Sequence, residues 1–455
     1  MKNMNYQDRL LRAIPGGAHT YSRGYDQYPS NAPQILSSGQ GAYVFDPEGK
    51  RYLDYGMALR AVNIGYAEES IDQAAWAQIR KGNNLTRASM IELEAAELLI
   101  GLIDSVDMVK FTKNGSTAVS AAVKLARAYT GREIVARCAE QPFFSFDDWF
   151  IGSTPLTRGV TRETILNTKT FHYNNIDSLA ALIEQHPGEI ACVVLEPSSL
   201  ECPAVGDQLS GCCGKAVCER NYSCAGPNYL QQVQALCHKN GIVFILDEMI
   251  TGFRWHIKGA QHSYGVTPDL CTFGKAMANG FAVACVAGKR DIMQLGSIEF
   301  EGTERVFLLS TTHGAEMGGL GAFIATMQFM QEHKAVEHLW NYGQDLRQMM
   351  ESKAELHGIG HSFKIRGPAC SPYFVTLAAD GSNSLGLRTL FSQEMIKNEV
   401  LMPWIALSYR HTQAELELTE CAVDHSFLIY RAALEEGLGK YLAGPAIKPV
   451  FRKFN

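Results

Sequence analysis

A lysine and a carboxylate pair in the middle of the chain are the residues whose types and spacing best suit chemistry. Asp247 and Glu248 directly follow the apolar run "GIVFIL". A carboxylate at the end of a buried strand can keep a heteroaromatic nitrogen protonated, because the negative charge favours the cation. Lys275 has only uncharged neighbours in "CTFGKAMANG". Burial lowers the pKa of a lysine, so such surroundings favour the neutral amine that a Schiff base needs.

A third feature is the segment "KNGSTAV", residues 113–119. Gly115, Ser116 and Thr117 place backbone N–H groups and hydroxyls at the start of a predicted helix. The N-terminus of a helix attracts anions, so this segment is suited to a phosphate.

Each feature also has an ordinary structural interpretation. The pair Asp247 and Glu248 could cap the next turn, Lys275 could be a solvated surface lysine, and a hydroxyl at 116 or 117 could be an N-cap with no ligand. Taken together, a phosphate cradle, a carboxylate for a ring nitrogen and a desolvated lysine are what a protein supplies to pyridoxal 5′-phosphate (PLP).

The elements around these residues predict an α/β fold. From about residue 90, short apolar runs alternate with segments of helical spacing. Over 115–131, Ala118, Ala121, Ala122, Leu125 and Tyr129 share one face, and Gly131 is the predicted stop. Strands that alternate with helices indicate a largely parallel sheet, in which ligands gather at the carboxyl ends of the strands.

The two ends of the chain differ from its middle. "GAYVFDPEGKRYLDYG" near the N-terminus predicts two short strands around a turn, and helices mix with short strands after about residue 326. We therefore predict a large PLP-binding domain over 66–325 and a smaller α+β domain built from 1–65 and 326–455.

Composition narrows the classes of function. The chain has 455 residues, of which 46% are hydrophobic and 19% charged, and its net charge is −6. No basic field favours nucleic acid or an anionic membrane, no apolar run is long enough to span a bilayer, and the N-terminus lacks the apolar core of a secretory signal. We expect no nucleic-acid or membrane partner, and a cytoplasmic protein.

Five of the twelve cysteines cluster in "ECPAVGDQLSGCCGKAVCERNYSC", residues 201–224. Their spacing matches no pair of CxxC motifs of a zinc ribbon. We interpret the segment from Cys202 to Cys224 as a surface insertion that is either redox-sensitive or merely cysteine-rich, and predict no metal site.

The chain resembles the class III PLP-dependent aminotransferases of fold type I, and within them the glutamate-1-semialdehyde aminomutase-like subgroup. The motifs that carry the resemblance occur in the family's order along nearly the whole chain: "PGGAHTYSRG", "GAYVFDPEGKRYLDY", "KNGSTAVSAAVKLARAYTGR", "DEMITGFR", "GVTPDLCTFGKAMANG" and "STTHGAE". The pair "DEMITGFR" and "TFGKAMANG" is the most specific of them.

The resemblance assigns roles to five residues around the cofactor. It implies that Lys275 forms the Schiff base with PLP and later moves the proton, and that Asp247 pairs with the pyridinium nitrogen. Met249 would lie against the ring, and Gly115 and Ser116 would hold the phosphate.

The resemblance also assigns residues further from the ring. Thr311, in "STTHGAE", would reach the phosphate of the neighbouring subunit, which implies a homodimer. Arg23, in "PGGAHTYSRG", stands where the aminomutase has the arginine for a substrate carboxylate.

The sequence departs from the family around the substrate. In "CAEQPFFSFDDWFIG", Phe143 would stack on the ring where the family has another aromatic residue, and Phe144 would replace a histidine. Leu59 would replace a tryptophan, with Arg60 beside it, and Glu316 stands in a turn that usually holds Asn-Pro.

The implied reaction is the transfer of an amino group from an amino-acid donor to an aldehyde, keto-acid or keto-sugar acceptor. Three alternatives stay open: an intramolecular aminomutase of the glutamate-1-semialdehyde type, a PLP racemase or epimerase, and a non-catalytic protein with this fold. Retention of Lys275, Asp247 and the segment Gly115–Ser116 argues against the last.

Overall fold

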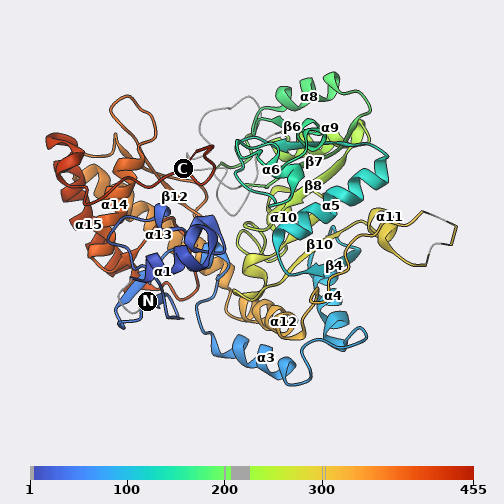
Figure 1. The fold of residues 1–455 in the computed structure, drawn as a ribbon, viewed down its shortest axis with the longest axis horizontal. Coiled ribbons are helices and arrows are strands. Elements are labelled where there is room, and N and C mark those ends of the chain that lie inside the picture. Colours follow the sequence, from blue (N-terminus) through green and yellow to red (C-terminus); the bar gives the residue numbers. More distant parts are fainter. Residues whose placement is uncertain (1–4, 199–200, 206–225, 300, 303, 455) are drawn as a thin grey trace. The chain divides into compact units, whose positions relative to one another are not determined.

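The chain folds into two compact units, seen in a computed structural model that describes residues 5–198, 201–205, 226–299, 301–302 and 304–454 (Figure 1). Unit 1 joins the residues up to Glu68 with those from Glu337 onward, and unit 2 comprises Glu69–Val336. The N-terminal and C-terminal parts of the chain thus share one unit, and the central part forms the other.

Unit 2 is built on a seven-stranded sheet in the order β4-β10-β9-β8-β7-β5-β6. The strands are β4 (Met108–Thr112), β5 (Ile134–Cys138), β6 (Thr168–Phe171), β7 (Ile190–Leu195), β8 (Val243–Asp247), β9 (Leu270–Phe273) and β10 (Ala284–Gly288). Only β10 runs antiparallel to its neighbours, β4 and β9. The predicted largely parallel sheet is confirmed, and the carboxyl ends of β8 and β9 lie side by side.

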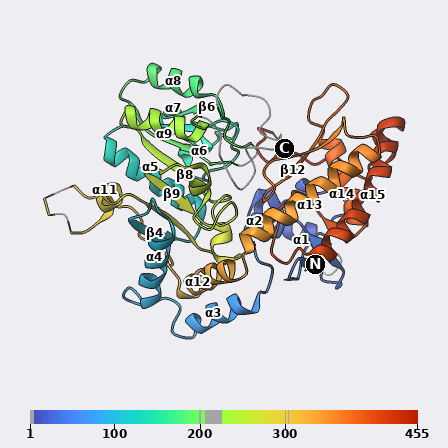
Figure 2. The same ribbon diagram turned by 180° about the vertical axis from the view of Figure 1, so that it is seen from behind.

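Helices cover this sheet. They are α3 (Glu69–Ile79), α4 (Met90–Leu102), α5 (Gly115–Thr130), α6 (Asp148–Ile151), α7 (Arg162–Leu166), α8 (Ile176–Gln185), α9 (Tyr229–Lys239), α10 (Ala260–Tyr264), α11 (Arg290–Met293) and α12 (Met317–Glu332). Helix α5 packs across β10, β9, β8 and β7. Figures 1 and 2 show α3 and α12 side by side, although the whole sheet separates them in the sequence.

Helix α5 follows the predicted pattern with one exception. It begins at Gly115 and ends before Gly131, whose φ of 66° is left-handed. Of the residues that the spacing places on one face, Ala118, Ala121, Ala122 and Leu125 are buried. Tyr129, in the last turn, is 48% exposed, and its hydroxyl donates to Asp291.

Unit 1 combines a four-stranded sheet with helices. Its elements are α1 (Tyr6–Ala13), β1 (Ser38–Gln40), β2 (Tyr43–Phe45), β3 (Arg51–Asp54), α2 (Met57–Arg60), α13 (Ala335–Leu356), β11 (Phe363–Arg366), β12 (Tyr373–Thr376), α14 (Leu385–Lys397), β13 (Val400–Leu401) and α15 (Gln413–Glu436). The sheet has the order β1-β2-β3-β13, with β13 parallel to β3, while β11 and β12 form a separate hairpin. Two distant parts of the chain therefore complete one sheet.

The short element α2 is a left-handed turn. Met57, Ala58, Leu59 and Arg60 have φ values of 38°, 48°, 62° and 68°. None of these residues is glycine, and a side chain in this conformation costs about 1–2 kcal/mol per residue. A strained run of this length persists only where its surroundings fix it.

Asp54 and two aromatic side chains hold this turn. The carboxylate of Asp54 accepts hydrogen bonds from the backbone N–H of Gly56 at 2.6 Å and of Met57 at 3.0 Å. The Tyr66 hydroxyl donates to Asp54 at 2.6 Å and accepts from the N–H of Ala58 at 2.8 Å. The indole of Trp404 donates to the carbonyl of Gly56 at 3.0 Å. The buried carboxylate and its donors thus oppose the strain of the turn.

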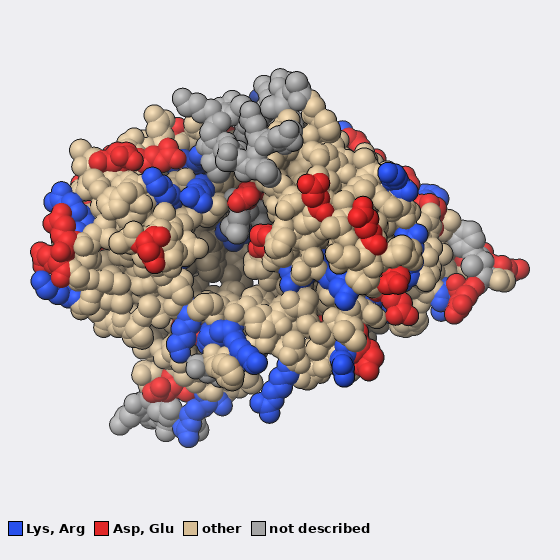
Figure 3. Space-filling model, turned by 90° about the horizontal axis from the view of Figure 1, so that it is seen from above, with Lys and Arg blue, Asp and Glu red and all other residues tan. Residues whose placement is uncertain are grey.

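The surface carries charges of both signs. On the face in Figure 3, lysine and arginine side chains are interspersed with aspartate and glutamate. Within the part of the chain that the structure describes, no helix combines the length and apolar character needed to cross a bilayer.

The left-handed turn yields a stability prediction. Tyr66→Phe removes one of the three donors to the buried Asp54 carboxylate and the acceptor for Ala58, so we expect the free energy of unfolding to fall by about 2–3 kcal/mol. The matched control is Tyr52→Phe. Tyr52 is also buried in unit 1, but its hydroxyl reaches Asp46 only at 3.5 Å. Chemical denaturation should show a change within about 0.5 kcal/mol for this control. Equal losses in the two variants would contradict the role given to Tyr66.

Candidate active site

Asp247 ends strand β8 with a buried carboxylate. Its Oδ1 accepts from the backbone N–H of Met249 at 2.9 Å and from the Thr272 hydroxyl at 3.1 Å. Burial raises the pKa of Asp247 to about 6, and the positive charge of Lys275 and the two hydrogen bonds oppose the rise. The site thus holds a carboxylate for which a cationic partner would be strongly favourable.

Lys275 lies just past the carboxyl end of the adjacent strand. In the parallel pair of β8 and β9, Asp247 is opposite Thr272, so Lys275 follows three residues beyond that pair. Lys275 is half-buried and its φ is 45°. A lysine in the left-handed region is strained, and such strain concentrates at functional sites. Strand register explains why Asp247 and Lys275 interact although they are far apart in the sequence.

Met249 connects these two residues to the start of helix α5. Its side chain packs with Ala118 and Ala284. A Cβ atom at Gly115 would lie 2.9 Å from the Met249 sulfur, and one at Gly274 would lie 2.6 Å from it. Both distances are shorter than a normal contact, so a side chain at 115 or at 274 would require the Met249 side chain to move. The same residue whose N–H binds Asp247 therefore touches the phosphate candidate and the neighbour of Lys275.

The first turn of α5 has donors available for an anion. Asn114 caps the helix, and its side chain accepts from the N–H of Thr117 at 2.9 Å and from the Thr117 hydroxyl at 3.1 Å. The first donor within the helix is the N–H of Ala118. The N–H groups of Gly115 and Ser116 precede it, and such groups suit a phosphate. The N–H and the hydroxyl of Thr117 bind the Asn114 side chain, so the predicted phosphate site is limited to residues 115 and 116.

Phe143 lies in a loop that is tied to this turn. Ser116 Oγ accepts from the backbone N–H of Phe146 at 3.2 Å, and the Ser145 hydroxyl donates to the Ser116 carbonyl at 3.3 Å. The Phe143 ring is 47% exposed and packs edge-on against Phe150, with 5.7 Å between the ring centroids. An exposed aromatic ring on a loop anchored at Ser116 is compatible with stacking on a ligand held there.

The neighbouring Phe144 is used differently. It is buried, and it packs edge-on against the same Phe150 at 5.8 Å between the ring centroids. The two phenylalanines therefore divide into an exposed ring and a core ring.

Thr311 is exposed, in the segment that leads to helix α12. Within this segment Glu316 forms an ion pair with Lys113, the residue before the α5 cap. His313 Nδ1 lies 3.5 Å from the other oxygen of Glu316. Where the family usually has Asn-Pro, this chain thus has the carboxylate of Glu316. Its ion pair with Lys113 attaches the segment that carries Thr311 to the carboxyl end of β4.

Glu248, next to Asp247, has a structural task. Its carboxylate accepts from the Thr251 hydroxyl at 2.7 Å and from the N–H groups of Ala260 and Gln261 at 2.7 and 2.9 Å. Burial raises the pKa of Glu248, and these hydrogen bonds oppose the rise. Three donors from its own turn and from α10 therefore satisfy the Glu248 carboxylate.

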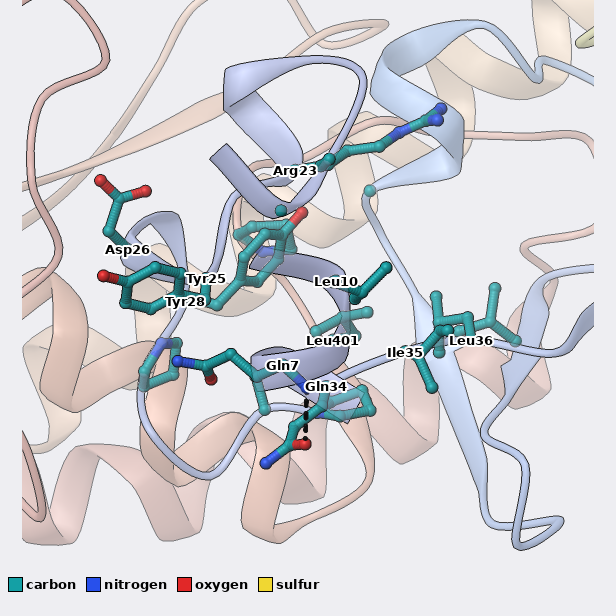
Figure 4. Close-up of a pocket in the computed structure, with 18 of the residues that line it drawn as sticks. Gln7, Leu10, Arg23, Tyr25, Asp26, Tyr28, Gln34, Ile35, Leu36 and Leu401 are labelled. Atoms are coloured by element: carbon teal, nitrogen blue, oxygen red, sulfur yellow. Dashed lines mark hydrogen bonds between the residues drawn. The ribbon is translucent and has the colours of Figure 1, made fainter. Parts of the chain in front are cut away.

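The three residues predicted to bind substrate lie in unit 1. Arg23 and Leu59 line one pocket, which has a volume of about 930 Å³ (Figure 4). Arg60 is on the same left-handed turn as Leu59. Its charge acts on Arg388. Burial, and to a lesser degree the charge of Arg60, lower the pKa of Arg388 to about 10. Arg388 donates to the carbonyls of Phe374 and Pro403.

Thr272 and Asn114 are the polar contacts that the sequence prediction missed. Thr272 stands three residues before Lys275, on a strand that pairs with β8, so correct strand pairing would have placed it beside Asp247. Asn114 is an ordinary N-cap residue before a predicted helix, and that signal was available.

Of the cysteine-rich segment, the structure describes only its beginning. Cys202 is buried, while Cys212, Cys213, Cys218 and Cys224 lie outside the described residues. Among the described residues, no group of three His, Cys, Asp or Glu side chains is arranged to hold a metal ion.

Comparison with known proteins gives relatives along the whole chain. The 3-aminobutyryl-CoA aminotransferase of Cloacimonas acidaminovorans (strain Evry) is 29% identical over 429 residues, which cover 93% of this chain and 96% of the relative. The glutamate-1-semialdehyde 2,1-aminomutase of Alkaliphilus oremlandii (strain OhILAs) is 34% identical over 301 residues, 64% of this chain and 66% of the relative.

Solved structures agree with these relatives. The FumI protein of Sphingopyxis sp. MTA144, in its PLP internal aldimine form, superposes with a TM-score of 0.81 at 26% identity and covers 95% of this chain and 97% of its own. An omega-transaminase from Sphaerobacter thermophilus superposes with a TM-score of 0.76 at 25% identity, over 95% and 97%.

The family model described as aminotransferase class-III matches residues 25–371. The match includes both strand ends of the site and the start of α5. Because it extends over well more than half of the chain, the protein belongs to the class III aminotransferases.

Proposed function

We propose that Lys275 binds PLP covalently in this aminotransferase and that Asp247 pairs with the ring nitrogen of the cofactor. Gly115 and Ser116 would bind its phosphate, with Met249 and Phe143 on the two faces of the ring. The observation that carries the proposal is the contact of one residue, Met249, with Asp247, Gly115 and Gly274 at once.

The residues present fit PLP. The cofactor needs an anion site, a partner for a protonated nitrogen and an amine, and unit 2 places candidates for all three around Met249. The raised pKa of Asp247 supports this assignment, because a protonated ring nitrogen would supply the positive charge that the buried carboxylate favours. The close approach of Met249 to Gly115 leaves backbone N–H groups, rather than a side chain, facing the phosphate position.

The chain's own groups would act as follows. Bound PLP supplies an electron sink when a bond at the substrate α-carbon breaks. Asp247 keeps the ring nitrogen protonated. Once a substrate amine has displaced it, the amine of Lys275 removes the proton from the α-carbon of the amino donor. In the second half of the reaction the same amine returns a proton to the carbon of the acceptor that receives the amino group. The hydroxyl of Ser116 accepts from Phe146 and still has its own hydrogen to donate.

The reaction moves an amino group from an amino-acid donor to an aldehyde, keto-acid or keto-sugar acceptor. Arg23 is our candidate for gripping a substrate carboxylate, through a bidentate pair. The name of one relative adds a β-amino acyl thioester to the donors worth testing. The aminomutase relative makes intramolecular transfer the second candidate. Turnover of a single substrate with no separate donor would favour it, and strict need for a donor would exclude it.

Substitution of Lys275 tests the proposed attachment of the cofactor. Lys275→Ala should lower amino transfer by more than about 10²–10⁴-fold, because the variant loses both the attachment point and the base. Borohydride reduction followed by mass spectrometry should no longer find PLP bonded to the protein. Lys239→Ala, an exposed lysine of the same unit, should keep both properties. Full activity of the Lys275 variant would rule out this mechanism.

The charge of Asp247 makes the stability of the protein depend on pH. The folded pKa of about 6 is above the value of 3.8 for an exposed aspartate, so the apo protein loses stability as pH rises from about 4 to 6. Asp247→Asn keeps an acceptor for Met249 and Thr272 but carries no charge. At pH 8 we expect the apo variant to be more stable than wild type by up to about 3 kcal/mol.

Denaturation of both apo proteins at pH 8 and pH 5 measures this difference. It should shrink at the lower pH, where wild-type Asp247 becomes protonated. In the PLP-loaded proteins the order should reverse, because only the carboxylate pairs with the cofactor. A variant that is less stable than wild type in the apo form at pH 8 would contradict the proposal.

We propose that the active protein is a homodimer in which Thr311 contacts the phosphate bound by the neighbouring subunit. Thr311 is exposed. Helices α3 and α4 and the segment between them also expose large apolar side chains, and such surfaces favour association. They are Trp76, Ile79, Leu85, Met90, Leu93 and Ile100.

A mixed dimer tests this sharing. Thr311→Ala and Lys275→Ala homodimers should each have defective sites. A dimer with one chain of each kind would contain one intact site, built from Lys275 of the first chain and Thr311 of the second. Differently tagged chains, purified through both tags, should regain about half the wild-type turnover per dimer. If Thr311 served the site of its own chain, the mixed dimer would recover nothing.

A further inference from the structure

The entry segment, residues 311–316, leads into helix α12 and combines exposed hydroxyls with a backbone that unit 2 holds in place. Thr311 and Thr312 are exposed. The N–H of Gly314 donates to the Thr311 carbonyl at 3.2 Å, which closes a tight turn. The side-chain amide of Asn84, from the segment between α3 and α4, donates to the Thr312 carbonyl at 2.8 Å. The chain thus presents two hydroxyl groups outward on a backbone that its own residues fix.

Glu316 ends the entry segment at the N-cap position of α12, but another residue caps the helix. Within the described part of the chain, the Glu316 side chain makes no capping hydrogen bond. The carbonyl of Asn83 accepts from the N–H of Met317 at 2.7 Å, and its side chain accepts from the N–H of Gly318 at 3.0 Å. These two bonds satisfy donors that an N-cap side chain normally satisfies. The Glu316 carboxylate is therefore available for a different contact.

That contact is the ion pair with Lys113, the residue between strand β4 and the cap of α5. The Lys113 and Glu316 side chains are 31% and 29% exposed. Ion pairs that water reaches contribute little to the stability of a fold. What this pair does provide is a fixed position, because it connects the end of the entry segment to the chain that leads into the predicted phosphate site at Gly115.

We propose that the ion pair of Lys113 and Glu316 positions the entry segment so that its hydroxyls reach the phosphate of the cofactor bound by the neighbouring subunit. The inference rests on the proposed function, in which Thr311 serves that phosphate. Lys113 also neutralises the Glu316 carboxylate, which would otherwise repel the negatively charged phosphate. Lys113 and Glu316 act through the segment and are therefore positioning residues.

Pyridoxal, which lacks the phosphate group, separates this role from a merely structural one. The enzyme is stripped of cofactor and titrated with PLP or with pyridoxal. Borohydride then fixes the ligand, and mass spectrometry measures the fraction bonded to Lys275. Lys113→Met and Glu316→Gln should each raise the PLP concentration for half-occupancy by about three- to tenfold, and change the value for pyridoxal by less than about twofold. Equal weakening of both ligands, or no effect on PLP, would overturn the proposal.

An exchange of the two charges tests the pair itself. The double variant Lys113→Glu with Glu316→Lys rebuilds the ion pair in reverse, so its PLP affinity should return to within about threefold of wild type. Each reversal alone places like charges together and should weaken PLP more than the neutral variants do. The control is Lys258→Met, which breaks another ion pair of unit 2, between Lys258 and Asp104 at 3.0 Å. It should bind PLP as wild type does. No recovery in the exchange variant, or an equal loss in the control, would refute the assignment.

Mixed dimers identify the subunit on which the pair acts. In the first dimer, one chain carries Lys275→Ala and the other Lys113→Met. Its competent site receives the entry segment of the chain with Lys113 intact, so PLP should bind as in wild type. In the second dimer, one chain carries both substitutions and the other none. Its competent site receives the altered segment, and PLP should bind about three- to tenfold more weakly. The reverse order, or equal affinities, would show that Lys113 does not act through the neighbour and would overturn the proposal.

The same measurements separate this inference from the proposed function. A wild-type protein that attaches no PLP at Lys275 would refute the proposed function, and the inference with it. Normal attachment that does not depend on the ion pair, or a PLP-loaded wild type that is monomeric, would refute the inference and leave the role of Lys275 intact.

Discussion

The buried carboxylate of Asp247 is the group on which the rest of unit 2 depends. Removing a carboxylate from water costs several kcal/mol, and hydrogen bonds and positive charge in the interior must offset this desolvation cost. Here the N–H of Met249, the hydroxyl of Thr272 and the charge of Lys275 do so. The N–H bond fixes where the chain turns after β8, and hence where the Met249 side chain lies. A side chain at 115 or at 274 would in turn displace the Met249 side chain.

The two neighbouring carboxylates show that environment, more than residue type, assigns a role. Asp247 is the last residue of β8, and Glu248 directly follows the strand. Glu248 meets a hydroxyl and two N–H groups of its own turn and of α10. Asp247 meets two donors on one oxygen and a lysine. The sequence "DE" contains no sign of this difference, because the donors for Glu248 become visible only when α10 is placed.

Much of unit 2 could be predicted because its signals are local or periodic. The apolar runs match the strands of the sheet except β6, whose sequence TKTF is not apolar, and the small residues of α5 face the sheet as their spacing indicates. The direction of β10 could not be predicted, since a strand buried on both faces has the same composition in either direction. The exposure of Tyr129 could not be predicted, since spacing identifies the residues that share a helix face but not how far along the helix that face is buried.

The left-handed turn at 57–60 is the part of the site region that no local pattern could have indicated. Its four residues have side chains, so their own preference is against the observed conformation. What fixes it comes from elsewhere: Asp54 before it, Tyr66 after it, and Trp404, 348 residues away in the chain. Leu59 therefore enters the pocket wall only because a buried carboxylate and two aromatic side chains hold the backbone against its preference. It follows that the shape of the pocket lined by Arg23 and Leu59 is set partly by hydrogen bonds to the backbone of Gly56, Met57 and Ala58.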